Sequence, residues 1–227
     1  MPDVSTSRQL ALALDHSESF AREDFLEGPP NKAALGRIES FPDWPDHIMA
    51  LVGPQGAGKS HLAAIWAGQA GARFVAGRAL DAASVPAVLA TGAVVVEDLA
   101  AGTFDERALF HLLNMAREEG AFVLLTARTT PASWTTSVPD LLSRLRSIPV
   151  VALSAPDDEL LRALIVKLFA DRQLAIDESL VGYLVTRIER SFPAARAAVE
   201  MLDREALRRQ RPANRALAAE LWRDRTA

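Results

Sequence analysis

The distribution of apolar and polar residues along the chain predicts two regions of different architecture. Up to about residue 154, short apolar runs alternate with longer amphipathic stretches, as buried strands alternate with helices. From Ala155 onward every apolar pattern has helical spacing. The sequence therefore predicts an α/β fold: a three-layer parallel-sheet domain over residues 21–154 and a small all-α lid domain over residues 155–227. Residues 1–20 are expected to form a separate N-terminal segment.

The individual elements follow from the same pattern. Strands are predicted at residues 48–52, 73–75, 93–96, 121–125 and 150–153. Helices are predicted at residues 31–40, 61–67, 79–90 and 105–120, and in the lid at residues 156–172, 177–190, 193–209 and 214–222. We expect Asn31 to cap the first helix and Gly68 to end the second.

A glycine-rich segment follows the first strand and matches a phosphate-binding motif. Residues 53–60 fit G-x-x-x-x-G-K-[ST] without a mismatch, and a helix follows at once. The glycines let successive backbone N–H groups turn toward phosphate oxygens, and the helix N-terminus adds its positive dipole end. Lys59 is expected to reach the outer phosphates and Ser60 to hold a magnesium ion. The predicted nucleotide-binding residues of this segment are Gly53, Pro54, Gln55, Gly56, Ala57, Gly58, Lys59, Ser60 and His61.

Two further strand ends carry candidate chemistry. Glu97 and Asp98 end a mostly β-branched run, at the sheet edge where α/β proteins bind ligands. This Walker-B-like pair predicts Glu97 as a magnesium ligand and Asp98 as the group that polarises water; the alternative is a solvated strand end. Thr126 ends the next strand, where its hydroxyl can reach a γ-phosphate or the attacking water, or simply cap the strand.

Composition narrows the function classes. The net charge of −4 argues against a surface built for non-specific nucleic-acid binding. The absence of cysteine excludes disulfides and thiolate zinc sites. The N-terminus has no apolar h-region, and no apolar run reaches membrane-spanning length, so we expect a soluble, cytoplasmic protein without a membrane partner.

The N-terminal segment contains the sequence Gln9-Leu10-Ala11-Leu12-Ala13-Leu14 before a polar stretch. Alternating leucines are typical of a strand or an extended peptide. On the residue pattern alone, this segment is either a docking peptide that binds a partner in extended form, or an edge strand or apolar tail packed on the domain.

These motifs, in this order, resemble the AAA+ class of P-loop ATPases over nearly the whole chain. Within that class the chain is most similar to the DnaA family of replication initiators, and there to its short Hda (HdaA) branch. Phe25-Leu26-x-Gly28-x-x-Asn31 resembles the family segment that borders the adenine. Residues 109–114 and 124–126 resemble the helix and strand of its sensor-1 region, and residues 139–145 resemble its arginine-finger segment.

The resemblance implies ADP or ATP with Mg²⁺ as cofactors, with Phe25 and Leu26 beside the base. It implies Arg144 as an arginine finger. Family alignment places Pro193 where the sensor-2 arginine is expected, and either Arg190 or Arg196, one helical turn to each side, is the candidate for that role.

The resemblance also implies partners. Gln9, Leu10, Leu12 and Leu14 would fill the pocket of the DNA polymerase III sliding clamp, and DnaA itself would be the protein acted on. The expected function is negative regulation of replication initiation, through stimulated ATP hydrolysis by DnaA. The chain stops about where the lid ends, so we do not expect it to recognise replication-origin boxes. Homo-dimerisation is an open expectation, since AAA+ domains act across subunit interfaces.

Two further departures from the family pattern, besides Pro193 at the sensor-2 position, and two other functions stay open. Glu97 is longer than the usual aspartate, and Thr126-Ala127-Arg128 stands where the family often has Thr-x-Asp. The main alternative is a self-sufficient AAA+ ATPase motor or loader whose own turnover does the work. The other is a clamp adaptor in which the nucleotide site is only structural.

Overall fold

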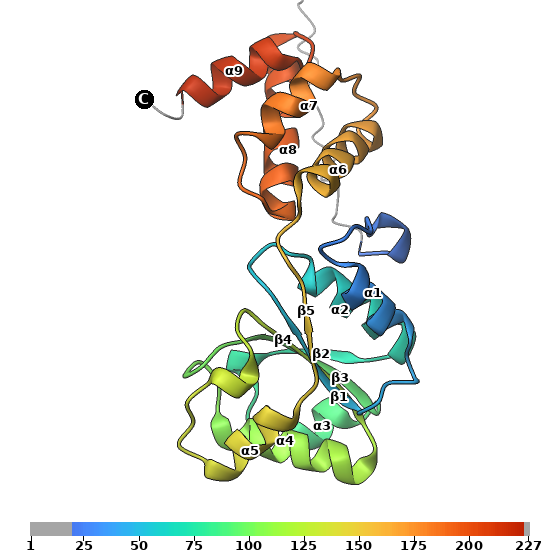
Figure 1. Cartoon of the computed structure of the whole chain (residues 1–227), viewed down its shortest axis with the longest axis vertical. Coiled ribbons are helices and arrows are strands. Elements are labelled where there is room, and N and C mark those ends of the chain that lie inside the picture. The colour runs from blue at the N-terminus through green and yellow to red at the C-terminus, as the bar shows by residue number, and fades with distance from the viewer. Residues whose placement is uncertain (1–19, 225–227) are drawn as a thin grey trace, which may run out of the picture.

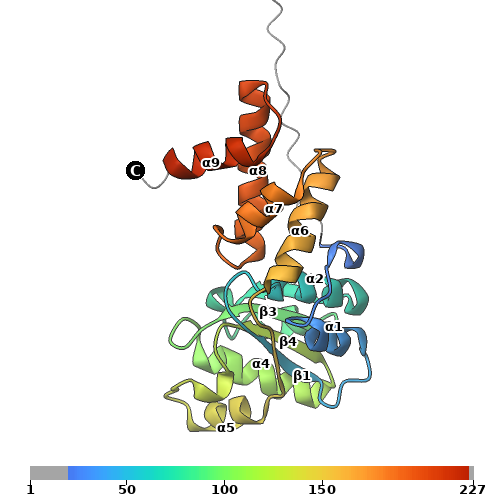
Figure 2. The same ribbon diagram turned by 45° about the horizontal axis from the view of Figure 1, so that its top comes forward.

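The computed structural model of the chain describes residues 20–224. The Gln9–Leu14 segment lies outside the described residues, so its role as a docking peptide stays a prediction. Figures 1 and 2 show a sheet covered by helices at one end of the molecule and a group of helices at the other. Among the described residues, no helix is long and apolar enough to cross a membrane.

One five-stranded sheet organises the first domain. All four strand pairings are parallel, and the strand order is β2-β3-β4-β1-β5. The strands are β1 (Ile48–Val52), β2 (Arg73–Ala76), β3 (Ala93–Leu99), β4 (Phe122–Ala127) and β5 (Val150–Ala152). Each overlaps a predicted strand. Because β1 lies between β4 and β5, the segment that follows β1 leaves the sheet from an interior strand and not from an edge strand.

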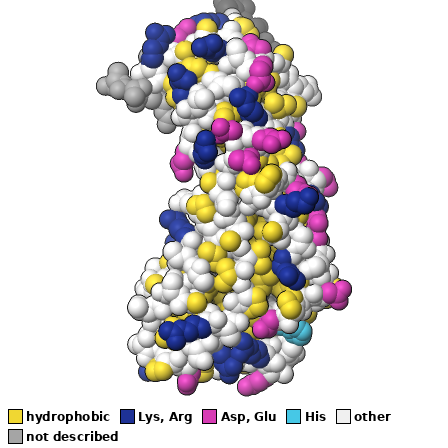
Figure 3. All heavy atoms as spheres, viewed as in Figure 1, with side chains coloured by type: hydrophobic (Ala, Val, Ile, Leu, Met, Phe, Trp, Pro, Cys, Tyr) yellow, Lys and Arg dark blue, Asp and Glu magenta, His cyan; other side chains and the backbone are white. Residues whose placement is uncertain are grey.

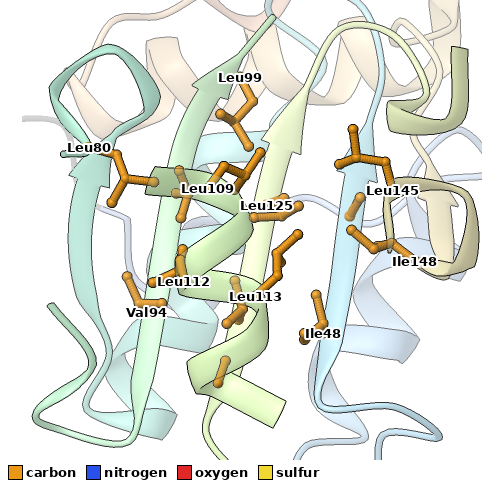
Figure 4. Packing of buried hydrophobic residues seen from close by; sticks show 14 of the residues in the cluster. Ile48, Leu80, Val94, Leu99, Leu109, Leu112, Leu113, Leu125, Leu145 and Ile148 are labelled. Carbon is orange, nitrogen blue, oxygen red and sulfur yellow. The ribbon is translucent and has the colours of Figure 1, made fainter. Parts of the chain in front are cut away.

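The side chains of a strand alternate between the two faces of the sheet, so a buried strand presents apolar residues on both. Helices cover both faces. Ile48, Ala50 and Val52 of β1 belong to one apolar cluster, whereas Met49 and Leu51 belong to another. The first cluster is completed by α3 (Val85–Leu89), α4 (Glu106–Glu119) and α5 (Pro139–Ser147), and Figure 4 shows part of this packing. The second is completed by α1 (Lys32–Glu39) and α2 (Lys59–Ala70). The result is the predicted three-layer α/β fold.

The lid is entirely helical in the described part of the chain. Its helices are α6 (Asp158–Asp171), α7 (Glu178–Val185), α8 (Phe192–Arg209) and α9 (Arg215–Asp224), and they bury an apolar cluster of their own. Asp157, Asp177 and Ser191 cap the first three of these helices, each accepting a hydrogen bond from a backbone N–H of the first turn. These caps fix where α6, α7 and α8 begin, and the fold class is confirmed as predicted.

The segment before the sheet connects the two domains. A short 3₁₀ turn, η1 (Arg22–Asp24), lies beside α6, and Lys167 Nζ donates to Asp24 Oδ1 at 2.7 Å. Leu26 packs against the apolar cluster of the lid. Two more 3₁₀ turns, η2 (Gly77–Ala79) and η3 (Pro131–Ser133), lie in the sheet domain.

Three predicted helix boundaries were wrong. The helix predicted at residues 177–190 ends at Val185. Helix α2 continues past Gly68 to Ala70 and ends at Gly71, whose φ of +65° suits the left-handed position that terminates a helix. Within the predicted helix 79–90, only Val85–Leu89 is α-helical. It starts next to Pro86, since proline fits the first turn of a helix but not its interior.

Candidate functional site

The glycine-rich segment forms a loop between β1 and α2. Gly56 and Gly58 have φ values of +74° and +95°, in the region that favours residues without a Cβ atom. Gly58 stands immediately before α2, so the loop ends at the positive end of that helix. Backbone N–H groups at such a position are suited to bind phosphate oxygens.

The Lys59 side chain lies inside this loop. It is only 7% exposed, and its Nζ donates to the carbonyl oxygens of Gly53 at 2.9 Å and Pro54 at 2.8 Å. Burial lowers the pKa of Lys59 because it disfavours the charged form. The nearby Asp98 carboxylate opposes this shift, and the charge of Arg128 adds to it. The Lys59 ammonium is therefore influenced by one carboxylate, that of Asp98, and by a second cation, the guanidinium of Arg128.

A cavity of about 400 Å³ lies between the loop, the N-terminal segment and the lid. Its volume is in the range of small-molecule sites. It is lined by Phe20, Asp24, Phe25, Leu26, Gln55, Gly56, Gly58, Lys59, Ser60, His61, Asp98, Arg128, Leu164, Phe192, Pro193 and Arg196. The fold thus brings together ten of the predicted site residues. Gly53, Pro54, Ala57, Glu97, Thr126 and Arg144 are not among the lining residues.

The N-terminal wall of the cavity is held by Asn31. Its Oδ1 accepts from the Gly28 N–H and its Nδ2 donates to the Leu26 carbonyl, both at 2.9 Å. The prediction that this side chain caps α1 was wrong, because both ends of the amide are engaged in closing the preceding loop. The closed loop places Phe25 against His61, with ring centroids 5.2 Å apart in an edge-on arrangement.

The two acids at the end of β3 point in different directions because of a bulge. The pairing register with β4 shifts between Val96 and Leu99, and Asp98 adopts a φ of +54°. Its N–H donates to Thr126 Oγ1 at 3.0 Å, which offsets part of the strain of a left-handed aspartate. Asp98 consequently lines the cavity and Glu97 does not, while the buried Thr126 hydroxyl lies behind Asp98 as its hydrogen-bond acceptor.

The lid reaches the glycine loop through the start of α8. The Phe192 N–H donates to the Gly56 carbonyl at 3.1 Å. A Cβ atom on Gly56 would lie 2.6 Å from Ser191 Cβ, and one on Gly58 would lie 3.4 Å from the Phe192 ring. The loop and the lid are therefore in direct contact, and a movement of one must affect the other.

The structure distinguishes between the two candidate sensor-2 arginines of the lid. Arg196, in the first turns of α8, lines the cavity. Arg190 precedes α8, pairs with Asp158 at 2.8 Å and does not line the cavity. Of the two alternatives, Arg196 is the one in position to contact a ligand there.

Several lining residues were not predicted. Arg128 directly follows β4, and its place at a strand end beside β1 was a usable signal. Asp24, Leu164 and Phe192 carry no recognisable motif. Leu164 and Phe192 reach the cavity because the lid folds over the loop, and Asp24 because its turn packs beside α6. Such contacts between distant segments leave no local pattern in the sequence.

Arg144 occupies a different part of the molecule. It lies on α5, whose Leu141 and Leu145 are fully buried against the sheet domain. Figure 1 places α5 at the end of the sheet domain that is remote from the lid, and Figure 3 shows basic side chains on the surface in that region. The partly exposed Arg144 side chain is thus available to a partner rather than to the chain's own cavity.

No protein-family model and no curated protein sequence matches the chain. Solved structures do. Domain III of the replication initiation protein DnaA from Thermotoga maritima is 17% identical, with a TM-score of 0.74 over 90% of this chain and 96% of that one. AMPPCP-bound DnaA from Aquifex aeolicus is 15% identical, with a TM-score of 0.67 over 81% and 65% of the two chains. The RuvB R170A variant from Thermotoga maritima is 17% identical, with a TM-score of 0.70 over 89% and 70%. The chain therefore has the fold of the DnaA and RuvB AAA+ domains.

Proposed function

We propose that the chain is an Hda-type regulator that inactivates DnaA after replication has started. Nucleotide, ADP in the resting state, binds the cavity between the glycine loop and the lid. The N-terminal peptide docks on the DNA-loaded sliding clamp. Arg144 then reaches ATP bound in DnaA and stimulates its hydrolysis, which leaves DnaA in the ADP-bound form.

The cavity supports the nucleotide part of this proposal. The loop offers backbone N–H groups, a helix N-terminus and the Lys59 ammonium for phosphates. Ser60 and Asp98 present a hydroxyl and a carboxylate to the same space, the oxygen ligands that Mg²⁺ prefers. A bound magnesium ion would neutralise phosphate charge there. Since α8 contacts Gly56 directly, nucleotide in this space would also hold the lid in one arrangement.

The position of Arg144 is the observation that carries the regulatory proposal. An arginine finger stabilises negative charge that develops on the transferred phosphoryl group, and its planar guanidinium is suited to that task. Arg144 does not line the cavity of its own chain, and it stands on a helix whose other face is fixed in the core. Arg144 is therefore not part of the chain's own cavity, and a finger role for it requires a nucleotide held by another subunit.

The test measures ATP hydrolysis by DnaA in the presence of the loaded clamp, with two matched variants. Arg144→Ala removes the proposed finger, and Arg146→Ala removes the neighbouring arginine of the same short helix. Loss of an arginine finger typically lowers the rate by a factor on the order of 10³–10⁵. We expect Arg144→Ala to abolish the stimulation and Arg146→Ala to retain it. Undiminished stimulation by Arg144→Ala would exclude the assignment.

Clamp docking is tested separately with the intact chain. Gln9→Ala/Leu10→Ala is expected to abolish clamp binding, measured with and without ADP, because these residues supply the polar and apolar anchors of the peptide. If the unmodified chain does not bind the clamp, the peptide has another role and the regulatory proposal loses its link to the replication machinery.

The second candidate is a self-sufficient AAA+ ATPase, and one observation favours it. Asp98 faces the cavity beside Lys59 and can polarise a water molecule there. Steady ATP turnover by the purified chain alone, lost in Asp98→Asn, would support this alternative. Absence of turnover in the presence of Mg²⁺ would leave the regulator as the better reading of the site.

A further inference from the structure

The lid contains a second hollow, which shares no lining residue with the cavity at the glycine loop. It lies between α7, the turn that follows α7, and the first residue of α9; these two helices contact each other on the side of the lid away from the sheet (Figure 1). Its volume is about 250 Å³, and its lining residues are Ser179, Gly182, Tyr183, Thr186, Arg187 and Arg215. Two arginines and two hydroxyls therefore face one small space, and none of the described residues that line it is acidic.

The Arg187 guanidinium is held in place by uncharged groups. Its Cζ lies 4.0 Å from the centre of the Tyr183 ring, and its Nη1 donates to Thr186 Oγ1 at 3.2 Å. Tyr183 in turn meets the ring of Trp222 on α9 edge-on, with centroids 6.4 Å apart. A guanidinium that stacks on an aromatic ring keeps donors along its edge available. Arg187 is thus oriented while its charge is left for a ligand.

Arg215 faces the hollow from the start of α9. The helix end itself is already satisfied, because the Asn214 side chain accepts a hydrogen bond from a backbone N–H of the first turn. The pKa of Asp177 is lowered chiefly by its hydrogen bonds with the Ser179 hydroxyl and the Leu180 N–H, and further by the charge of Arg215. Asp177 therefore acts on Arg215 through space, while its Oδ1 belongs to the cap of α7.

The other lid arginines show how an exposed arginine of this domain is usually compensated. The ion pairs are Arg162 with Glu178, Arg172 with Asp203, Arg190 with Asp158, Arg204 with Glu200, Arg208 and Arg209 with Glu205, and Arg211 with Glu220. Arg187 and Arg215 are exposed, and within residues 20–224 neither forms an ion pair. Two like charges at one hollow repel each other, and an anion between them reverses that effect.

We propose that this hollow, the α7–α9 site, binds a phosphate group of a nucleic-acid backbone. The oxygens of a phosphate can accept hydrogen bonds from the edges of two guanidiniums at once. Both arginines are exposed, so a single anion held by them gains little affinity in water. Such a contact is effective as one point along a polymer that carries a phosphate at every step.

The choice of DNA as that polymer rests on the proposed function, in which the chain acts at a DNA-loaded clamp; the two-arginine site does not depend on it. The site also agrees with the net charge of −4, because it supplies two cations and no broad basic surface. We therefore expect weak DNA binding with a shallow salt dependence. Loss of both arginines should reduce the slope of log K against log salt concentration by about 2.

The experiment measures binding of a fluorescent DNA duplex to the full-length chain by anisotropy, at several salt concentrations. Arg187→Ala/Arg215→Ala is expected to weaken binding roughly tenfold at low salt, because it removes both phosphate contacts. The matched control, Arg208→Ala/Arg211→Ala, removes the same charge from the same domain, but from arginines that pair with Glu205 and Glu220. It should weaken binding by no more than about twofold.

Three outcomes would overturn the inference. They are absence of DNA binding by the unmodified chain at low salt, an equal loss in the control variant, and unchanged DNA binding in the test variant. If DNA binding is unchanged while stimulation of DnaA is lost, the hollow receives an acidic protein surface instead. Melting temperatures report on folding; if the alanine variant does not fold, Arg187→Gln/Arg215→Gln replaces it.

The same titration distinguishes this inference from the proposed function, because it contains no nucleotide, clamp or DnaA. Arg144→Ala should leave DNA binding by the chain alone unchanged, since Arg144 lies on α5 in the other domain. Failure of the Arg144 or clamp experiments would therefore remove the regulatory proposal and leave the DNA titration as an independent result.

Discussion

The cavity and the α5 surface are built in opposite ways. The cavity collects side chains from the N-terminal segment, the glycine loop, two strand ends and two lid helices, and its central cation, Lys59, is buried. The α5 surface comes from one short helix that buries Leu141 and Leu145 and leaves its arginines outside. A site that the chain completes by itself can hold a ligand alone, whereas the α5 arginines can contact a nucleotide only if another molecule carries it. This difference is what the separate roles proposed for the two regions require.

The largest expected effect concerns how α5 is held. Leu145 is fully buried in the cluster that joins α5 to the sheet. Leu145→Ala is expected to lower the free energy of unfolding by about 3 kcal/mol, since a large core side chain leaves a cavity behind. Arg146→Ala, one residue further on and exposed, should change it by less than about 0.5 kcal/mol. Urea unfolding followed by circular dichroism measures both. If both substitutions lowered the free energy of unfolding equally, α5 would not have one buried and one exposed face.

The next prediction tests whether nucleotide binding depends on the cavity and not on the α5 surface. Lys59→Ala should weaken nucleotide binding roughly hundredfold, about 2.7 kcal/mol, because it removes the buried cation of the loop. Arg144→Ala should leave nucleotide binding unchanged, since Arg144 does not line the cavity. Calorimetric titration with ADP provides the comparison, with melting temperatures as the control for folding. A loss of nucleotide affinity in Arg144→Ala would show that the two regions are coupled.

The same contrast explains what sequence reasoning could and could not predict. The five strands and the glycine loop were predictable because each depends on a local pattern: continuous apolar runs, and a motif that fixes backbone shape. The direction of Asp98 was not, since it depends on a bulge that is visible only when β3 and β4 are paired. Nor was the contact of Phe192 with the loop, which depends on how the lid sits over the sheet. Arg144 was found from resemblance rather than from pattern, and its role stays a prediction.

The contact between lid and loop can be broken with a single Cβ atom. Gly56→Ala must adopt a φ of +74° and would place its Cβ 2.6 Å from Ser191 Cβ, so either the loop or α8 has to move. The left-handed backbone alone costs roughly 1–2 kcal/mol. We expect nucleotide affinity to fall about tenfold and the melting temperature to drop.

The matched control lies on the helix that follows the same loop. Gly68 is exposed within α2, and a Cβ there would meet nothing within 4 Å. Gly68→Ala should therefore stabilise the protein by about 0.5–1 kcal/mol, because alanine favours the helix, and leave nucleotide affinity unchanged. If Gly56→Ala behaves like Gly68→Ala, the loop and the lid are not in contact in solution.

The smallest predicted effects are two pH dependences of opposite sign, one of stability and one of nucleotide affinity. Both arise from Lys59. Burial lowers its pKa below the ordinary value of 10.5. Between the lowered pKa and 10.5, the unfolded chain binds more protons than the folded chain, so the stability of the nucleotide-free protein rises with pH in that window.

Nucleotide affinity falls as the pH rises, because deprotonation of Lys59 removes a positive charge that faces the phosphates. Lys59→Arg stays charged throughout. We expect ADP affinity of the unmodified chain to fall as the pH rises toward 10.5, while that of Lys59→Arg stays level. Parallel decline in both proteins would show that Lys59 does not carry the phosphate contact.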